Sequence, residues 1–243
     1  MKKYILLCTT VVSVFLSNSF AQQGKIVSGD KKYDNYAYID AIKTYQRVAE
    51  KGYKSEDLFK KLGNSFYFNS EFEKAAKWYG ELFAQNTEVE PEYYYRYAQC
   101  LKSSGQTDKA SKIMTEFLAK SKNDDRAKLY AEDVNYLDKI KANSGRYKIE
   151  DAGINSKYSD YSSYVYNGKI YFASARDTGN FSQRKHKWTG EYFTNIYDAD
   201  LDPATGTASK VNKFKSAINT KFHEASPVFT KDGKTVYFTR NIR

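Results

Sequence analysis

Proline, cysteine and histidine are scarce in this sequence, which holds three prolines, two cysteines and two histidines among 243 residues. With only thirteen glycines as well, a collagen-like or Pro/Gly-rich disordered chain is excluded. The sequence also lacks a glycine-rich phosphate loop, a G-x-S-x-G nucleophile elbow and the paired cysteines of a zinc site. We therefore expect a protein that is not an enzyme and has no catalytic, cofactor-binding or metal-binding residues.

Long apolar runs are scarce too, and the one at the N-terminus predicts export. Two lysines precede an apolar run over residues 4–16, and Ser19 and Ala21 provide the small side chains that a signal peptidase needs. The run is shorter than the roughly 20 residues of a membrane-spanning helix. We expect a cleaved signal peptide over residues 1–21. Cys8 lies too early in the run for a lipid-modified cysteine.

Loss of the signal peptide would leave Cys100 as the one cysteine, so no internal disulfide is expected. Its neighbours Ala98 and Leu101 belong to an apolar helical pattern, and no histidine lies near it in the sequence. A thiol in such surroundings is inert. The pattern predicts a buried structural cysteine rather than a nucleophile.

Aromatic and basic residues are abundant, with 23 tyrosines, 15 phenylalanines and a net charge of +10. Tyrosine buries its ring while its hydroxyl reaches water or a partner, which suits half-buried repeat surfaces. The lysines are scattered among acidic residues, as in "KSEDLFKK" and "EFEKAAKW", and form no basic block. This pattern argues against nucleic-acid binding and fits a protein near anionic lipids or glycans.

Two short motifs, one with a histidine and one with alternating aspartates, are candidate metal sites. His223 and Glu224 are adjacent, so on a strand they would point to opposite faces, and no H-E-x-x-H spacing follows. Asp198, Asp200 and Asp202 alternate as in a calcium loop, but the glycine and the distal glutamate of such a loop are missing. We expect a strand-to-turn transition there, with calcium binding as the alternative.

Residues 22–145 read as helices, and they contain an internal repeat. Ala41, Ala75 and Ala110 are separated by 34 and 35 residues. Four positions after each alanine stands a large side chain, namely Tyr45, Tyr79 and Met114. Seven positions after each stand Val48, Leu82 and Phe117. Twelve positions before the second and third alanines stand the small residues Gly63 and Ala98. This register resembles the tetratricopeptide repeat, a helix-turn-helix unit of about 34 residues. An irregular helical bundle with accidental spacing is the alternative.

The resemblance implies a solenoid that grips a peptide or protein loop on its concave side. Its first repeat looks degenerate in the first helix, and residues 124–143 would form a single closing helix. Candidate binding residues are consecutive on one helix: Tyr93, Tyr94, Tyr95 and Arg96. An equal alternative is that these residues alternate between the core and the rim of that helix.

From residue 146 to 243 the helical periodicity gives way to short alternating runs typical of β-hairpins. Asn167-Gly168 and Asp232-Gly233 would supply the positive φ angles of two-residue turns. The run "SPVFTKDGKTVYFT" resembles the WD40-like blade of TolB-type β-propellers, and "SSYVYNGKIYFAS" resembles it more weakly. We therefore expect an α + β multidomain chain: a tetratricopeptide solenoid, then the first blade and part of a second blade of a propeller that these residues do not complete.

A long basic loop over residues 176–195 interrupts the first blade. Long loops in compact domains are often functional, and arginine and tryptophan often anchor interfaces. Its candidate recognition residues are Arg184, Lys185, Trp188 and Tyr192. The alternative is an ordered insertion that folds over the edge of its own blade.

The order of signal peptide, repeats and propeller resembles the OmpA-family envelope proteins of the Bacteroidota that accompany PorP/SprF-like outer-membrane barrels. That family is associated with type IX secretion and gliding motility. The resemblance implies a periplasmic scaffold, peripheral to the outer membrane, that binds a barrel protein and reaches peptidoglycan through a C-terminal domain beyond residue 243. Two alternatives remain open: a glycan-binding envelope module, and an exported propeller hydrolase whose catalytic part also lies beyond residue 243.

Overall fold

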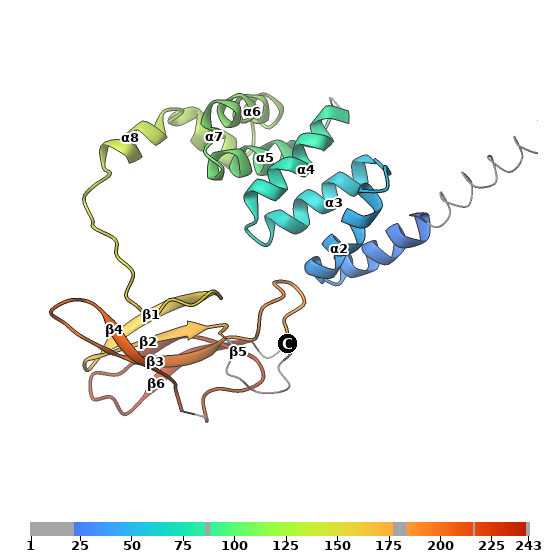
Figure 1. The fold of residues 1–243 in the computed structure, drawn as a ribbon. Coiled ribbons are helices and arrows are strands. Elements are labelled where there is room, and N and C mark those ends of the chain that lie inside the picture. Colours follow the sequence, from blue (N-terminus) through green and yellow to red (C-terminus); the bar gives the residue numbers. More distant parts are fainter. Residues whose placement is uncertain (1–21, 86–87, 177–183, 216, 242–243) are drawn as a thin grey trace, which may run out of the picture. The chain divides into compact units, whose positions relative to one another are not determined.

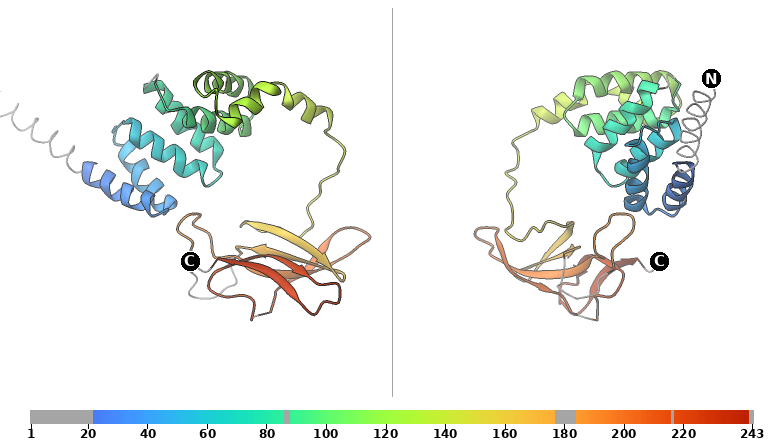
Figure 2. Two further views of the ribbon diagram at one scale, coloured as in Figure 1. Left: turned by 180° about the vertical axis from the view of Figure 1, so that it is seen from behind. Right: turned by 45° about the vertical axis from the view of Figure 1, so that its right-hand side comes forward.

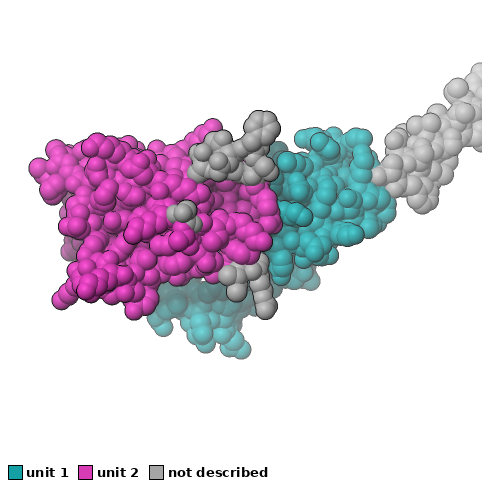
Figure 3. All heavy atoms as spheres, turned by 90° about the horizontal axis from the view of Figure 1, so that it is seen from below, with its two compact units in different colours: residues 1–142, 187–189 teal, residues 143–186, 190–243 magenta. Residues whose placement is uncertain are grey.

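A computed structural model describes residues 22–85, 88–176, 184–215 and 217–241. The predicted signal peptide over residues 1–21 lies outside these residues, as does the 177–183 part of the basic loop. The chain divides into two compact units, coloured separately in Figure 3: residues 1–142 with 187–189, and residues 143–186 with 190–243. The first unit is helical, and the second is built of β-strands.

The helical unit is a succession of helix pairs joined by short turns (Figures 1 and 2). A helix over residues 22–34 precedes the remaining helices, which are α2 (Tyr38–Ala49), α3 (Glu56–Tyr67), α4 (Phe72–Gln85), α5 (Pro91–Ser103), α6 (Thr107–Lys120), α7 (Asp125–Glu132) and α8 (Tyr136–Ala142). The closest packing is within the pairs α3/α4 and α5/α6, and α4 packs on α5, so the pairs form a helical repeat. None of the described helices is long and apolar enough to cross a bilayer.

Local sequence signals define where these helices begin. The Ser55 hydroxyl accepts a hydrogen bond from the Leu58 amide at 3.1 Å and caps α3. Pro91 stands in the first turn of α5, where its missing N–H costs nothing. The Asp124 carboxylate caps α7 by accepting from the Arg126 amide at 2.9 Å. Each cap satisfies donors that the helix itself leaves unpaired.

The core of the helical unit consists of the repeated positions that the sequence predicts. The three alanines and the large residues four and seven positions after them are all at most 2 % exposed, and so is Ala98. Because the same positions are buried in each pair, one set of contacts is used three times along the unit. This part of the prediction is confirmed.

Each of the first two pairs closes on a contact between a glycine and a tyrosine ring. A Cβ atom placed on Gly63 would lie 2.3 Å from Cε1 of Tyr79. A Cβ atom on Gly29, twelve positions before Ala41, would lie 2.4 Å from Cε1 of Tyr45. The first helix of the first repeat therefore carries the same close approach as the second repeat, and the prediction that it is degenerate is wrong at this contact.

The closing segment of the unit is two helices and not the single helix expected from the sequence. Helix α7 ends at Glu132, and Asp133 leaves the helical conformation with φ of −145°. Residues 133–135 read Asp-Val-Asn, which are all weak helix formers. The Asp133 carboxylate accepts a hydrogen bond from Lys139 of α8 at 2.6 Å, which holds the bend.

The strand unit contains a four-stranded antiparallel sheet in the order β1-β2-β3-β4, with strands β1 (Asp160–Tyr166), β2 (Lys169–Ser174), β3 (Asn195–Leu201) and β4 (Ala208–Lys213). Its first turn is the predicted one, because Asn167 and Gly168 have φ of 48° and 71°. Ile154 and Ala208 join Phe172 and Tyr197 in a small buried cluster on this sheet.

A second, two-stranded sheet pairs β5 (His223–Phe229) with β6 (Val236–Asn241). The two-residue turn predicted at Asp232-Gly233 is wrong. Gly233 has φ of 68°, but Asp232 is not in the left-handed region, and residues 230–235 form a longer loop. The Asp232 carboxylate organises this loop by accepting from the Thr230 hydroxyl at 2.6 Å and the Lys234 amide at 3.1 Å.

The two hairpins of this unit are alike in detail. Each first strand is interrupted by a serine in the left-handed region, Ser162 with φ of 53° and Ser226 with φ of 54°. The ladder shifts its register at both serines, so both are β-bulges. The Ser226 hydroxyl lies 3.2 Å from that of Ser162, 64 positions away. The hairpins are thus an internal repeat, whereas a closed propeller remains a prediction.

Replacement of Gly63 by alanine tests the close approach within the second helix pair. Its Cβ would overlap the Tyr79 ring, so we expect Gly63→Ala to lower the free energy of unfolding by about 1–3 kcal/mol. Urea unfolding followed by helical circular dichroism measures this change. Gly24→Ala is the matched control, since nothing lies within 4 Å of a Cβ there and alanine favours a helix. Equal effects of the two substitutions would contradict the prediction.

Candidate functional site

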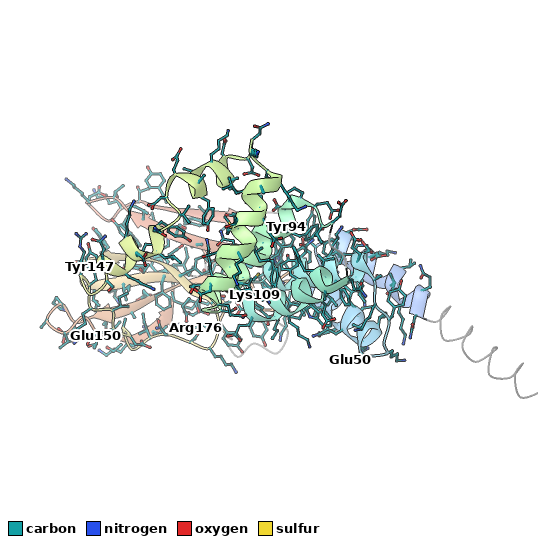
Figure 4. All side chains as sticks on the ribbon, turned by 90° about the horizontal axis from the view of Figure 1, so that it is seen from above. Glu50, Tyr94, Lys109, Tyr147, Glu150 and Arg176 are labelled. Atoms are coloured by element: carbon teal, nitrogen blue, oxygen red, sulfur yellow. The ribbon has the colours of Figure 1, made fainter. Side chains whose placement is uncertain are left out.

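The predicted binding residues on α5 divide between the core and the surface. Tyr94, which is labelled in Figure 4, is 2 % exposed. Its ring packs edge-to-face on Phe83, with ring centroids 4.6 Å apart. The expectation that Tyr94 contributes to a binding surface is therefore wrong, because consecutive helical residues point about 100° apart and this one points into the core. Tyr93 and Tyr95 are half-buried, and a cation lies over each ring: Lys60 at 5.1 Å and Arg126 at 4.3 Å.

Arg96 is the predicted residue with the richest set of contacts. Its Nη1 donates to Oδ1 of Asn64 on α3 at 2.6 Å, and its Nε donates to Oε1 of Glu92 at 3.0 Å. The guanidinium also lies 5.0 Å from the centroid of the Phe68 ring. Its side chain is 19 % exposed, so it links α5 to α3 along a surface that water still reaches.

Asn64 is the centre of a buried polar network. Its Oδ1 accepts from the hydroxyl of Tyr79 at 2.8 Å as well as from Arg96, and its Nδ2 donates to the hydroxyl of Tyr33 at 2.9 Å. Burial raises the pKa of the Tyr79 hydroxyl well above its ordinary value, so the hydroxyl stays protonated and donates. Because both polar atoms of the Asn64 amide are hydrogen-bonded, the network joins four helices without leaving this buried amide unsatisfied.

The same network occurs one helix pair earlier around Asp30. The Asp30 carboxylate accepts from the Tyr45 hydroxyl at 2.6 Å and from Nζ of Lys61 at 2.7 Å. Both central residues directly follow the glycine of the close approach and stand fifteen positions before their tyrosine. Burial, and then the hydrogen bond to Asp30, raise the pKa of the Tyr45 hydroxyl, so this hydroxyl also donates. The cation comes in each case from the first helix of the following pair.

The third helix pair departs from this pattern. Gln99 occupies the central position, but the residue fifteen positions later is Met114, which has no hydroxyl. The Gln99 side chain makes no hydrogen bond within the described part of the chain. Tyr130 of α7 stands 31 positions after Gln99, the spacing that separates Lys61 from Asp30. Its hydroxyl is buried and has no hydrogen-bond partner in the described structure.

A pocket of about 260 Å³ lies between α5 and α7 at this third position. Gln99, Met114 and Tyr130 line it together with Lys102 and Tyr136. Nζ of Lys102 donates to the Tyr136 hydroxyl at 2.9 Å and lies 5.5 Å from the centroid of the Tyr130 ring. The pocket combines aromatic walls with polar groups, as small binding sites do.

Sequence reasoning missed this pocket, although a signal for it was present. The large residue four positions after the repeated alanine is tyrosine in two repeats and Met114 in the third. A change from a hydroxyl-bearing to an apolar side chain at a buried repeat position indicates that its polar partner is released or replaced. The partner, Gln99, is one position after the small residue Ala98.

The residues predicted in the basic loop lie in two groups. Lys185 pairs with Tyr192 in an isolated β-bridge, and its Nζ lies 5.2 Å from the centroid of the Tyr192 ring. The Arg184 guanidinium lies 5.5 Å from the Phe193 ring. Trp188 belongs to the segment 187–189, which groups with the helical unit, and there its indole N–H donates to the Phe68 carbonyl at 3.1 Å.

His223 and Glu224 point to opposite faces of β5, as the sequence predicts. Glu224 is fully buried and accepts from Nε of Arg240 at 2.9 Å and from the Thr220 hydroxyl at 2.5 Å. On the other face, His223 meets the His186 ring edge-to-face with centroids 4.8 Å apart. The sequence did not predict either pairing, because the partners are sixteen and thirty-seven positions away.

The alternating aspartates of β3 are neutralised by a lysine of the neighbouring strand. Nζ of Lys169 donates to Asp198 at 2.8 Å and to Asp200 at 2.9 Å, and these hydrogen bonds raise the pKa of Lys169. Asp202 instead accepts from the Ala204 amide at 2.8 Å in the following turn. Among the described residues there is no group of three or more side chains able to hold a metal ion.

Cys100 is fully buried in the helical core, as predicted. Burial raises the pKa of its thiol to about 12. The thiolate is the nucleophilic form of cysteine, so this residue is inert at neutral pH.

No protein-family model matches this chain. No curated protein matches it. Among solved structures it is similar to PcrH in complex with the chaperone binding region of PopB, with 18 % identity and a TM-score of 0.36 over 48 % of this chain and 94 % of that one. It is also similar to the Yersinia enterocolitica type III secretion translocator chaperone SycD in an alternative dimer, with 20 % identity and a TM-score of 0.36 over 51 % and 94 %. Similarity at this level does not identify a shared function.

The paired histidines make the stability of the strand unit depend on pH. Burial lowers the pKa of both imidazoles, and His186 lowers that of His223 further, while Glu224 opposes this. Nδ1 of His186 is buried without a hydrogen-bond partner among the described residues. In the unfolded chain a histidine titrates near pH 6.5, so below this pH the unfolded state binds more protons. We therefore expect the unfolding free energy to fall as the pH drops from 7.5 to 5.5.

Urea unfolding at several pH values, followed by amide NMR signals of β2 in the full chain, measures this dependence. His186→Phe keeps an aromatic ring beside His223 and removes one titrating group, so its profile should be flatter. Carboxylates with lowered pKa values, such as Asp200 and Asp232, also contribute to the free energy of unfolding. They lose this contribution only below the pH range of 5.5 to 7.5. The same slope in the variant and the parent would count against the histidine pair as the cause.

Proposed function

We propose that the helical unit is a protein-binding module and that the chain is a non-enzymatic scaffold. The observation that supports this most directly is the row of polar and aromatic side chains along the first helices of successive pairs. Lys61 bonds back to Asp30, Arg96 to Asn64, and Arg126 of α7 to Glu92 of α5 at 2.8 Å. These contacts make one continuous face out of residues 22–34, α3, α5 and α7.

The composition of this face suits recognition of a polypeptide. Tyrosine and arginine are the residue types enriched where protein interfaces bind most strongly. The side chains of Arg96 and Arg126 are 19 % and 38 % exposed, so each is held in place and is still accessible. A preorganised face of this kind loses less conformational entropy on binding than a row of free side chains.

The cellular setting of the proposed scaffold comes from the sequence. A cleaved signal peptide, helical repeats and a blade-like strand unit support a periplasmic protein that binds a PorP/SprF-like outer-membrane barrel of the type IX secretion or gliding machinery. Its link to peptidoglycan would be made by a C-terminal OmpA-like domain beyond residue 243. The glycan-binding module and the exported hydrolase are the competing functions, and the experiment below separates them from the scaffold.

We expect an outer-membrane barrel protein to co-purify with the tagged native gene product from gently solubilised envelopes. Mass spectrometry identifies both the partner and the intact mass of the product. Arg96→Gln removes the bridge from α5 to α3 and should reduce recovery of the barrel at least tenfold. Lys43→Gln on α2 should not, because within the described structure Lys43 forms an ion pair with Asp40 alone, on an exposed surface. The unfolding midpoints of both variants control for misfolding.

Other outcomes would contradict the scaffold. Recovery of the product without any protein partner would count against it. Retention of residues 22–243 on immobilised peptidoglycan or polysaccharide would favour the glycan-binding module. Hydrolase activity of the native product that requires residues beyond 243 would favour the enzyme.

A further inference from the structure

The third helix pair contains an incomplete copy of the polar network that the first two pairs complete internally. In the first two, a central oxygen of Asp30 or Asn64 accepts from a tyrosine hydroxyl and from a cation. In the third, Gln99 is the central residue, Met114 replaces the tyrosine, and Tyr130 stands where the cation would be. Within the described part of the chain, no hydrogen bond joins the Gln99 amide to Tyr130 or to a cation.

The Tyr130 hydroxyl is the group that marks this position as a candidate binding site. Tyr130 is 7 % exposed, and its hydroxyl is buried with no hydrogen-bond partner in the described part of the chain. A buried hydroxyl without a partner costs free energy, so native proteins rarely leave one unless a ligand or water satisfies it. Here the hydroxyl belongs to a side chain that lines the open pocket between α5 and α7.

The charged side chains around the pocket indicate the sign of the charge on its ligand. Arg126 is held by Glu92 at 2.8 Å and Asp124 at 2.7 Å, and Asp133 is held by Lys139. Lys102 makes no ion pair within the described residues, although it bonds the Tyr136 hydroxyl. The pocket therefore presents one uncompensated positive charge.

The hydrogen-bond donors beside the positive charge of Lys102 indicate which chemical group the pocket would bind. Lys102 has further N–H donors, and the Gln99 amide and the Tyr130 hydroxyl can each donate one hydrogen bond or more. The first helix pair shows what satisfies such a set, since the Asp30 carboxylate accepts from a tyrosine hydroxyl and a lysine together. A carboxylate is the group that fits both the charge and the donors.

We propose that this pocket binds the carboxylate of an aspartate or glutamate side chain in the partner polypeptide. The proposal rests on the proposed function, because it takes the ligand to be a polypeptide. The carboxylate would accept from Tyr130, Gln99 and Lys102. The lining also contains the apolar surface of Met114, Tyr95 and Leu129, and Leu129 is 65 % exposed. Apolar surface beside the donors favours a side chain in the middle of a segment over a free C-terminus.

Binding of peptide pools to the full chain tests the proposal. The probes are nonapeptides with acetylated and amidated ends, random except for a central glutamate in one pool and a central glutamine in the other. We expect the parent protein to retain the glutamate pool at least tenfold more than the glutamine pool. Lys102→Gln should abolish this preference, and the exposed Lys43→Gln should leave it unchanged.

Tyr130→Phe separates a binding role from a structural one. It removes a hydroxyl that has no hydrogen-bond partner among the described residues, so the urea midpoint should stay the same or rise. Retention of the glutamate pool should nevertheless fall about fivefold or more. A residue that only supports the fold would lose binding and stability together, and that result would overturn the assignment of Tyr130.

The failures of the two proposals are distinguishable. Equal retention of both capped pools, or a preference that persists in Lys102→Gln and Tyr130→Phe, overturns the carboxylate site even where an outer-membrane partner co-purifies. Stronger retention of a central-glutamine pool with a free C-terminus overturns the choice of a side chain. Selective retention of the glutamate pool without a co-purifying partner supports the carboxylate site and counts against the scaffold.

Discussion

A tyrosine ring lying against a residue that has no side chain determines the geometry of the helical unit. Because Gly63 offers only a hydrogen atom, the Tyr79 ring approaches the backbone of the opposite helix and fixes the distance between the two helices. At that distance its hydroxyl reaches Asn64, the residue after the glycine, and Asn64 in turn meets Arg96 of the next pair. One steric contact thus sets both the packing within a pair and the polar contact between pairs.

The third pair keeps the steric part of this arrangement and gives up the polar part. Ala98 replaces the glycine and Met114 the tyrosine, so the core is still filled, with both residues at most 2 % exposed. Within the described residues, the Tyr130 hydroxyl is then left without a hydrogen-bond partner. Places where a chain violates its own local pattern are often the functional ones, since stability alone would have kept the pattern.

The sequence predicted the buried positions of the repeat well, and it predicted polar contacts poorly. Apolar spacing reveals buried positions because burial follows the helical period, so Ala75, Tyr79 and Leu82 could be placed from their register. The first helix of the first repeat was predicted to be degenerate, yet Gly29 makes the same close approach to a tyrosine ring as Gly63. Which residues on one helix point outward was also unresolved, as Tyr94 shows. The networks join positions 15 and 31 or 32 apart, and no short-range pattern contains them.

The ion pair between Glu224 and Arg240 constrains the folding of the second hairpin. Glu224 is fully buried, and its charge is compensated by an arginine sixteen positions later on the other strand of the hairpin. A carboxylate buried without its cation is strongly unfavourable. Burial of β5 is therefore unfavourable in a chain that lacks Arg240, so we expect the two strands of this hairpin to become buried together.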